Sequence, residues 1–114
     1  MGYVEAFAYV EELFSEAIVI STPAQINQNG VYLLFDGARS INAAQDELFF
    51  VLVVAANSYA KQNGAMAKID EIRNKTLETF KYASIKFGGV EALTFETGTL
   101  YLVAYKFSLE IDIG

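Results

Sequence analysis

The N-terminal segment has the hydrophobic spacing of an amphipathic helix. Between residues 3 and 17, apolar side chains recur every three or four positions, at Tyr3, Phe7, Val10, Phe14 and Ala17. This spacing places them on one face of an α-helix. Glutamates fill the positions largely outside that face, at Glu5, Glu11, Glu12 and Glu16. We therefore predict a helix over residues 3–17 with one buried face and one acidic face.

A short strand and a loop are predicted to follow this helix. Residues 18–22, IVIST, are mostly β-branched, which favours a strand, and Pro23 cannot continue a helix. The segment TPAQINQNG, residues 22–30, is polar and ends in Asn-Gly, a dipeptide typical of turns. We expect residues 22–30 to form a loop.

Two strands are predicted in the middle of the chain. The first, GVYLLFDG, lies between Gly30 and Gly37, and its apolar run ends at Asp36. The second lies in ELFFVLVVAAN, where residues 48–55 are apolar at both odd and even positions. Such a strand is buried on both faces and belongs in the centre of a sheet. The polar residues between the two strands, 36–46, are predicted to form a loop.

A second helix is predicted from Asn63 to Phe80. Asn63 is a suitable N-terminal capping residue for this helix. One apolar stripe follows at helical spacing, formed by Ala65, Ile69, Ile72, Thr76 and Phe80. Charged side chains lie mostly outside that stripe. This pattern predicts a helix with one face packed on a sheet.

The C-terminal third of the chain is predicted to be β-structure. In TLYLVAYKFSLEIDIG, the odd positions from Tyr101 to Ile113 are apolar or aromatic, whereas the even positions become polar from Lys106 onward. This strand should begin buried on both faces and end with one face exposed to water. The segment FETGTL predicts a hairpin turn near Gly98, which would make the last two strands antiparallel.

These elements predict a single α+β domain spanning residues 1–114. Its mainly antiparallel sheet should have four to five strands and pack against two helices. A chain of 114 residues with 54% hydrophobic residues is long and apolar enough for one such core. Its longest apolar run, residues 48–56, is much shorter than the roughly 20 residues of a membrane span, so no membrane association is expected.

The composition narrows the chemistry that the chain can perform. It has no cysteine and no histidine, which excludes thiolate sites, serine–histidine catalysis and histidine-containing metal sites. Its net charge of −6 disfavours nucleic-acid binding, which depends on neutralising phosphates. An enzyme that used carboxylates or lysines would need them to converge in a pocket, and no motif indicates this.

The acidic residues are interpreted as structural. Glu11, Glu12 and Glu16 fit an exposed helix face, and so do Asp70 and Glu71. Asp46 and Glu47 precede the central strand, where charges discourage aggregation. We therefore predict no enzymatic activity, no catalytic residues and no cofactor or metal site.

The apolar content of the predicted sheet indicates self-association. Strands that are apolar on both faces leave more hydrophobic surface than two helices can cover, and surfaces of that kind tend to be interfaces. The loops 36–46 and 57–63 are long for so small a domain and are the predicted contact regions. The candidate contact residues for an oligomer or partner are Asp36, Arg39, Ser40, Asn57, Tyr59 and Lys61.

Residues from about 28 to 111 resemble a family of phage tail proteins. Gly64 and Ala65 open the second helix, and Ile69, Ile72, Arg73 and Leu77 follow at the positions where Mu-like phage tail-terminator proteins have small, aliphatic and arginine residues. The upstream segment NGVYLLFDGAR is also similar to the glycine-led strand and small-residue turn of that family.

The resemblance implies a structural virion subunit assembled in the cytoplasm of a host bacterium. Six subunits would form a ring that caps the tail tube, ends tail polymerisation and joins the tail to the head connector. DNA would pass through the ring without sequence-specific binding, and no cofactor would be needed. Two alternatives remain open: another head–tail joining or adaptor protein, and a small ligand- or peptide-binding module.

Overall fold

Over its described residues, the protein is an α+β domain with two helices and five strands. The structure is a computed structural model that describes residues 1–82, 85–93 and 100–113, with side chains in the second helix described as far as residue 77. Its elements are α1 (Tyr3–Leu13), β1 (Ile18–Val19), a 3₁₀ turn η1 (Pro23–Gln25), β2 (Gly30–Asn42), β3 (Gln45–Ala56), α2 (Ala65–Tyr82), β4 (Ile85–Leu93) and β5 (Tyr101–Asp112). The predicted fold class is confirmed.

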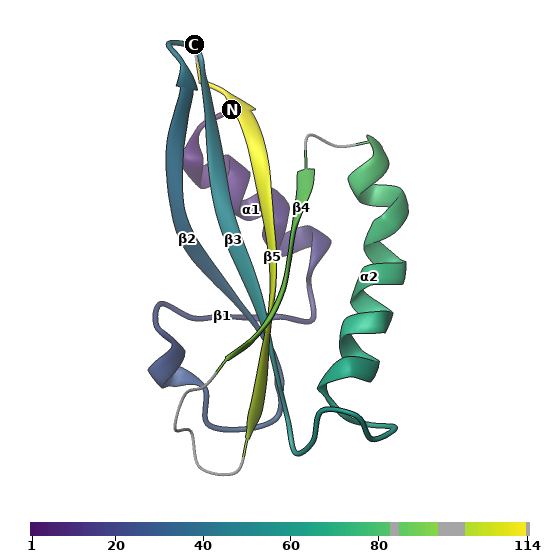
Figure 1. Cartoon of the computed structure of the whole chain (residues 1–114). Helices are drawn as coiled ribbons and strands as arrows, with labels where there is room; N and C mark the ends of the chain where they lie inside the picture. Colours follow the sequence, from purple (N-terminus) through teal and green to yellow (C-terminus); the bar gives the residue numbers. More distant parts are fainter. Residues whose placement is uncertain (83–84, 94–99, 114) are drawn as a thin grey trace.

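The five strands form one sheet in the order β1-β2-β3-β5-β4 (Figure 1). Among the strands that the structure describes, the short β1 runs parallel to its neighbour, β2, and the other pairs are antiparallel. β3 lies in the middle of this sheet, and its residues 52–56 are buried on both faces. The predicted central strand, the short strand before Pro23 and the antiparallel pairing of the last two strands are confirmed. The turn predicted near Gly98 lies outside the described residues.

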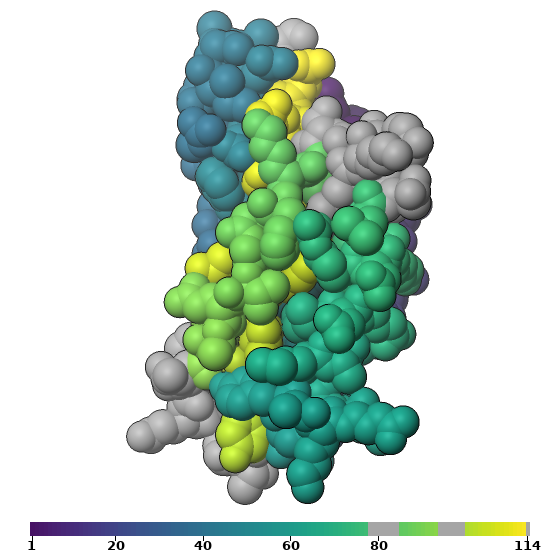
Figure 2. Space-filling view, turned by 45° about the vertical axis from the view of Figure 1, so that its right-hand side comes forward, coloured from purple at the N-terminus to yellow at the C-terminus, as the bar shows by residue number. Residues whose placement is uncertain are grey.

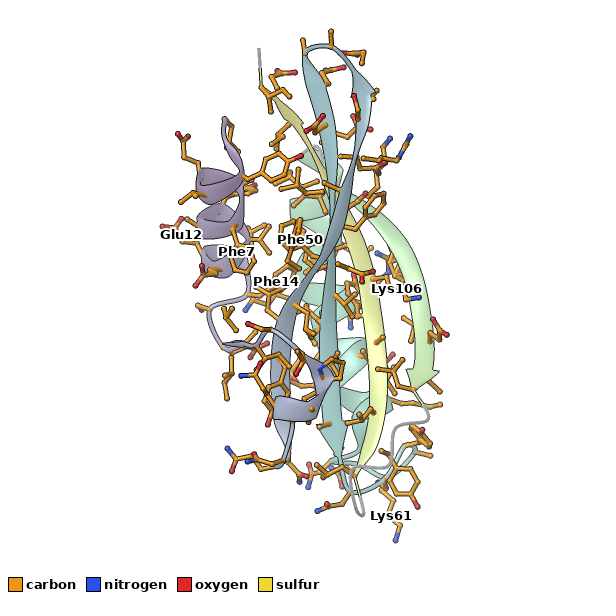
Figure 3. The ribbon with its side chains drawn as sticks, turned by 90° about the vertical axis from the view of Figure 1, so that its left-hand side faces the viewer. Phe7, Glu12, Phe14, Phe50, Lys61 and Lys106 are labelled. Carbon is orange, nitrogen blue, oxygen red and sulfur yellow. The ribbon has the colours of Figure 1, made fainter. Side chains whose placement is uncertain are left out.

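Both helices pack on the same face of the sheet and form the main core. Phe7 and Phe14 point from α1 toward the sheet, whereas Glu12 points away from it (Figure 3). The ring of Phe50 on β3 stacks on Phe107 of β5 at a centroid distance of 5.5 Å and meets Phe7 edge-on at 5.7 Å. The aromatic residues of the two central strands therefore anchor α1.

The second face of the sheet is partly covered by the segment between α1 and β2. Ile20 and Ile26, on either side of η1, are buried against Tyr32 and Val53, among other residues of this face. The sequence predicts a short strand at residues 18–22 and a polar loop at residues 22–30, and it leaves the apolar second face to be covered by other subunits. That expectation is corrected for this half of the face, because the chain covers it with its own isoleucines.

The predicted loop 36–46 is wrong, because β2 and β3 form one long hairpin there. β2 continues to Asn42, and β3 begins at Gln45. Arg39 pairs with Glu47, and Ser40 pairs with Asp46, in register. Asp36 lies at an irregularity in this register, between Phe35 and Gly37. Most side chains of this segment are exposed, which explains its polar composition. Its backbone pairs with β3, and this pairing makes it a strand.

Both helix boundaries differ from their predicted positions. α1 ends at Leu13 rather than near Ala17, and the N–H of Phe14 donates to the Val10 carbonyl. Asn63 is not the capping residue, because α2 begins at Ala65. The N–H groups of Ala65 and Met66 instead donate to the carbonyls of Ser58 and Tyr59. The start of α2 is therefore satisfied by the backbone of the preceding loop.

Gly64 allows that loop to pass close to the start of α2. A Cβ atom at Gly64 would lie 2.8 Å from the carbonyl oxygens of Ser58 and Tyr59. We expect Gly64→Ala to lower the free energy of unfolding by at least about 1 kcal/mol, because backbone atoms would have to shift. Urea denaturation measures this change. Gly2→Ala is the control, since nothing lies within 4 Å of the added atom. Equal stability of the two variants would contradict the prediction.

Candidate interaction surfaces

The six predicted contact residues do not form one site. Asp36, Arg39 and Ser40 lie on β2, opposite the first half of β3, whereas Asn57, Tyr59 and Lys61 follow the C-terminal end of β3. β3 has 12 residues, and a strand of that length spans roughly 40 Å. Figure 3 shows Lys61 at the far end of the sheet from the β2–β3 turn.

Within each group, the residues differ in solvent exposure. Arg39 and Ser40 are exposed, and the Ser40 hydroxyl donates to the Asn42 carbonyl. Lys61 and Asn57 are exposed as well. Tyr59 is half-buried, with its ring centroid 4.8 Å from that of Tyr101. Tyr59 is therefore part of the packing under the β3–α2 loop rather than a freely exposed contact.

A polar face occupies the part of the second sheet face beyond Ile20 and Ile26. We use this name for the seven polar residues whose side chains interact across β2, β3, β5 and β4: Arg39, Glu47, Lys86, Glu91, Lys106, Ser108 and Glu110. Lys86 pairs with Glu110, and Lys106 pairs with Glu91. Each of these ion pairs raises the pKa of its lysine, first through the hydrogen bond to the carboxylate.

Glu47 is the buried centre of the polar face. Glu47 lies on β3, and its side chain is 8% exposed. One carboxylate oxygen accepts from Arg39 Nε and the other from the Ser108 hydroxyl, each at 2.7 Å. The Ser108 hydrogen bond, aided by Arg39, holds the pKa of Glu47 below its ordinary value although burial opposes this shift. Glu47 thus stays ionised and fixes the exposed Arg39.

Sequence reasoning missed this role of Glu47 and treated it as a charge that flanks the strand. The alternation of polar and apolar residues in the last strand did indicate a polar face. Even positions of the last strand turn polar from Lys106 onward, and Ser108 is the register partner of Phe49, two residues after Glu47. The contact between Glu47 and Ser108 could be predicted only from the register of β3 against β5, and the sequence alone does not determine that register.

A hollow of about 370 Å³ opens on the polar face. Phe49 and Ser108 line it, together with Asp36, Lys86 and Lys106. Both lysines already hold carboxylates, and Glu47 holds Arg39. The charges of this hollow therefore largely neutralise one another, which suits a polar contact surface better than capture of a single ion.

An apolar groove lies between α1 and the sheet on the β2 side. This α1–β2 groove has a volume of about 430 Å³ and is lined by Tyr3, Val4, Phe7, Ala8, Glu11, Phe35 and Leu48. Val4 is 85% exposed, although it is apolar. The Tyr3 hydroxyl donates to Asp46, which raises the pKa of Tyr3 and ties the start of α1 to β3. This hydrogen bond therefore fixes Tyr3 at the edge of the groove.

A second apolar groove lies between α2 and β4. This α2–β4 groove has a volume of about 340 Å³ and is lined by Tyr59, Met66, Ile69, Asp70, Val90, Ala92 and Val103. α2 and β4 lie side by side on the face shown in Figure 2. Met66 is 58% exposed, and Arg73 lies over the Phe87 ring at 4.0 Å. Met66 follows the stripe residue Ala65, but most of its side chain is open to solvent.

The two apolar grooves lie at opposite edges of the sheet, on the face that both helices cover. β2 has only the two-residue β1 beyond it, and β4 is the last strand on the other side. The α1–β2 groove follows the first side, and the α2–β4 groove follows the second. A copy of the chain therefore presents two different apolar surfaces at opposite edges of its sheet.

The remaining features add no conventional binding site to the described part of the chain. Among residues 1–82, 85–93 and 100–113, no group of three potential metal-ligating side chains is placed to hold a metal ion. The helices in these ranges are too short or too polar to cross a membrane. No family model matches the sequence, and no curated protein matches it at a significant level.

Proposed function

We propose that the chain is a structural subunit that assembles head-to-tail into a ring, and that this ring caps a phage tail tube. The ring would be a hexamer that ends tail polymerisation and joins the tail to the head connector. It would be part of the virion and would assemble in the cytoplasm of the host bacterium. The proposed role requires neither catalysis nor a cofactor.

The two apolar grooves at opposite edges of the sheet carry this proposal. A symmetric dimer uses the same patch on both copies, whereas a ring needs two different patches that face in different directions. Val4 and Met66 expose apolar surface at two different patches, one at each edge of the sheet. Exposed apolar surface of this kind is typical of an interface.

The phage assignment rests on the sequence resemblance and agrees with the charge of the chain. The helix that begins at Gly64 and Ala65 carries the pattern of small and aliphatic residues found in tail-terminator proteins. A net charge of −6 would keep DNA from adhering to the ring as it passes through. A head–tail adaptor of another symmetry would use the same two surfaces.

Light scattering and electron microscopy of the purified protein test the assembly. We expect a mass corresponding to six chains and rings with six-fold symmetry. A second experiment adds the protein to polymerising tail-tube subunits of the same phage, where we expect the tubes to stop growing. Rings that fail to stop tube growth would contradict the capping role alone. A protein that stays monomeric and leaves tube growth unchanged would contradict the whole proposal.

A further inference from the structure

Each of the two helices carries one exposed apolar residue and one charged residue at the same spacing, and the charged residue of α2, Arg73, is half-buried. On α1, Val4 and Glu11 both line the α1–β2 groove and are seven residues apart. On α2, Met66 and Arg73 are also seven residues apart. Seven residues make about two helical turns, so each pair lies on one helix face with its members roughly 10 Å apart. The charges in the two pairs have opposite sign.

Neither Glu11 nor Arg73 takes part in an ion pair among the described residues. The cations Arg39, Lys68, Lys86 and Lys106 form all the ion pairs among the described side chains. Glu11 joins none of them and is exposed. Arg73 joins none either, and it lies against the Phe87 ring. Both charges can therefore serve a contact with another molecule.

We infer that the α1–β2 groove of one copy receives the exposed edge of α2 from the next copy; this inference rests on the proposed ring. Met66 would pack beside Val4, and the Arg73 guanidinium would pair with the Glu11 carboxylate. The occupant is a second copy of this chain because the two surfaces are complementary in three respects. Both are apolar, their charges are opposite, and the spacing between apolar and charged residue is the same.

The absence of cysteine from the chain allows a direct cross-linking test. Protein carrying Val4→Cys is mixed with protein carrying Met66→Cys under mild oxidation. We expect a disulfide-linked dimer from the mixture and little from either variant alone, because the contact joins two different surfaces. Asn74→Cys is the control for Met66→Cys, since Asn74 is exposed on a different face of α2. It should give no dimer with Val4→Cys.

Charge reversal tests the pairing of Glu11 with Arg73. We expect Glu11→Arg to weaken self-association about tenfold, because two positive charges would then meet, and Arg73→Glu to do the same. The two changes combined in one chain should restore association. Glu12→Arg and Lys75→Glu are matched controls outside the contact and should have little effect. Urea denaturation of each variant separates this loss from a loss of folding, since Arg73 also contacts Phe87.

The outcomes separate this contact from the proposed function. Rings that form without the mixed disulfide, or that tolerate both single charge reversals, would overturn the contact and leave the ring in place. Strong cross-linking of Val4→Cys with itself would also overturn it, because that result indicates a two-fold interface. A protein that forms neither rings nor the mixed disulfide would contradict both.

Discussion

Replacing Phe50 with alanine is expected to lower the free energy of unfolding by about 3–5 kcal/mol. Phe50 is 1% exposed and lies on the central strand β3. Its ring contacts Phe7 of α1 and Phe107 of β5 at centroid distances of 5.7 and 5.5 Å. The substitution removes buried apolar surface and leaves a cavity between the helix and the sheet. Urea denaturation followed by circular dichroism measures the loss.

Phe35 provides the matched control for this experiment. It is the register partner of Phe50 on β2, and their rings meet edge-on at 5.7 Å. Phe35 is 44% exposed, so Phe35→Ala should cost much less than Phe50→Ala. Similar losses for the two variants would show that Phe50 does not anchor α1 to the sheet as described.

The core around Phe50 was predictable because apolar spacing directly reflects burial. Residues 48–55 are apolar at every position, and a strand of that kind has to lie inside a sheet. The stripe of α2 was found in the same way, through Ala65, Ile72 and Thr76, which are buried. The spacing of apolar residues shows which side of a helix or strand is covered, and that information was enough to predict the fold class.

The end of the β2–β3 hairpin was not predictable from spacing. Residues 38–42 of β2 are exposed at every position, so no alternation marks them as a strand. Backbone pairing to β3 keeps them extended, through Ala38–Leu48 and Arg39–Glu47. Backbone hydrogen bonds depend little on side-chain type, which explains why a polar composition suggested a loop.

The grooves were missed because Val4 and Met66 lie just outside the apolar stripes, and because the stripe residue Tyr3 is itself 45% exposed. Val4 is adjacent to the stripe residue Tyr3, and Met66 follows Ala65. A single apolar residue beside a stripe widens the expected core, and only the packing shows that it is exposed. The predicted contact residues were instead sought in loops, and Arg39 was found on a strand and held by Glu47.

The second large effect is expected at Ser108, the partner of Glu47. Ser108→Ala should lower the free energy of unfolding at neutral pH by about 1.5–3 kcal/mol, because a buried carboxylate loses a hydrogen bond. The Ser108 hydroxyl donates to Glu47 at 2.7 Å, and both residues are buried. Ser40→Ala is the control, since the Ser40 hydroxyl is exposed. Urea denaturation at pH 7 measures both changes.

The pH dependence of this loss distinguishes the hydrogen bond from a simple packing effect. The folded protein holds the pKa of Glu47 below its ordinary value of 4.5, so near and below that pH the unfolded chain binds more protons. The stabilisation by ionised Glu47 is therefore complete above about pH 4.5 and disappears as the pH falls through the folded-state pKa. In Ser108→Ala that pKa moves back toward its ordinary value. The difference in stability between wild type and Ser108→Ala should consequently shrink in acid. A difference that stays constant from neutral pH into this acidic range would instead show that Ser108 acts by packing alone.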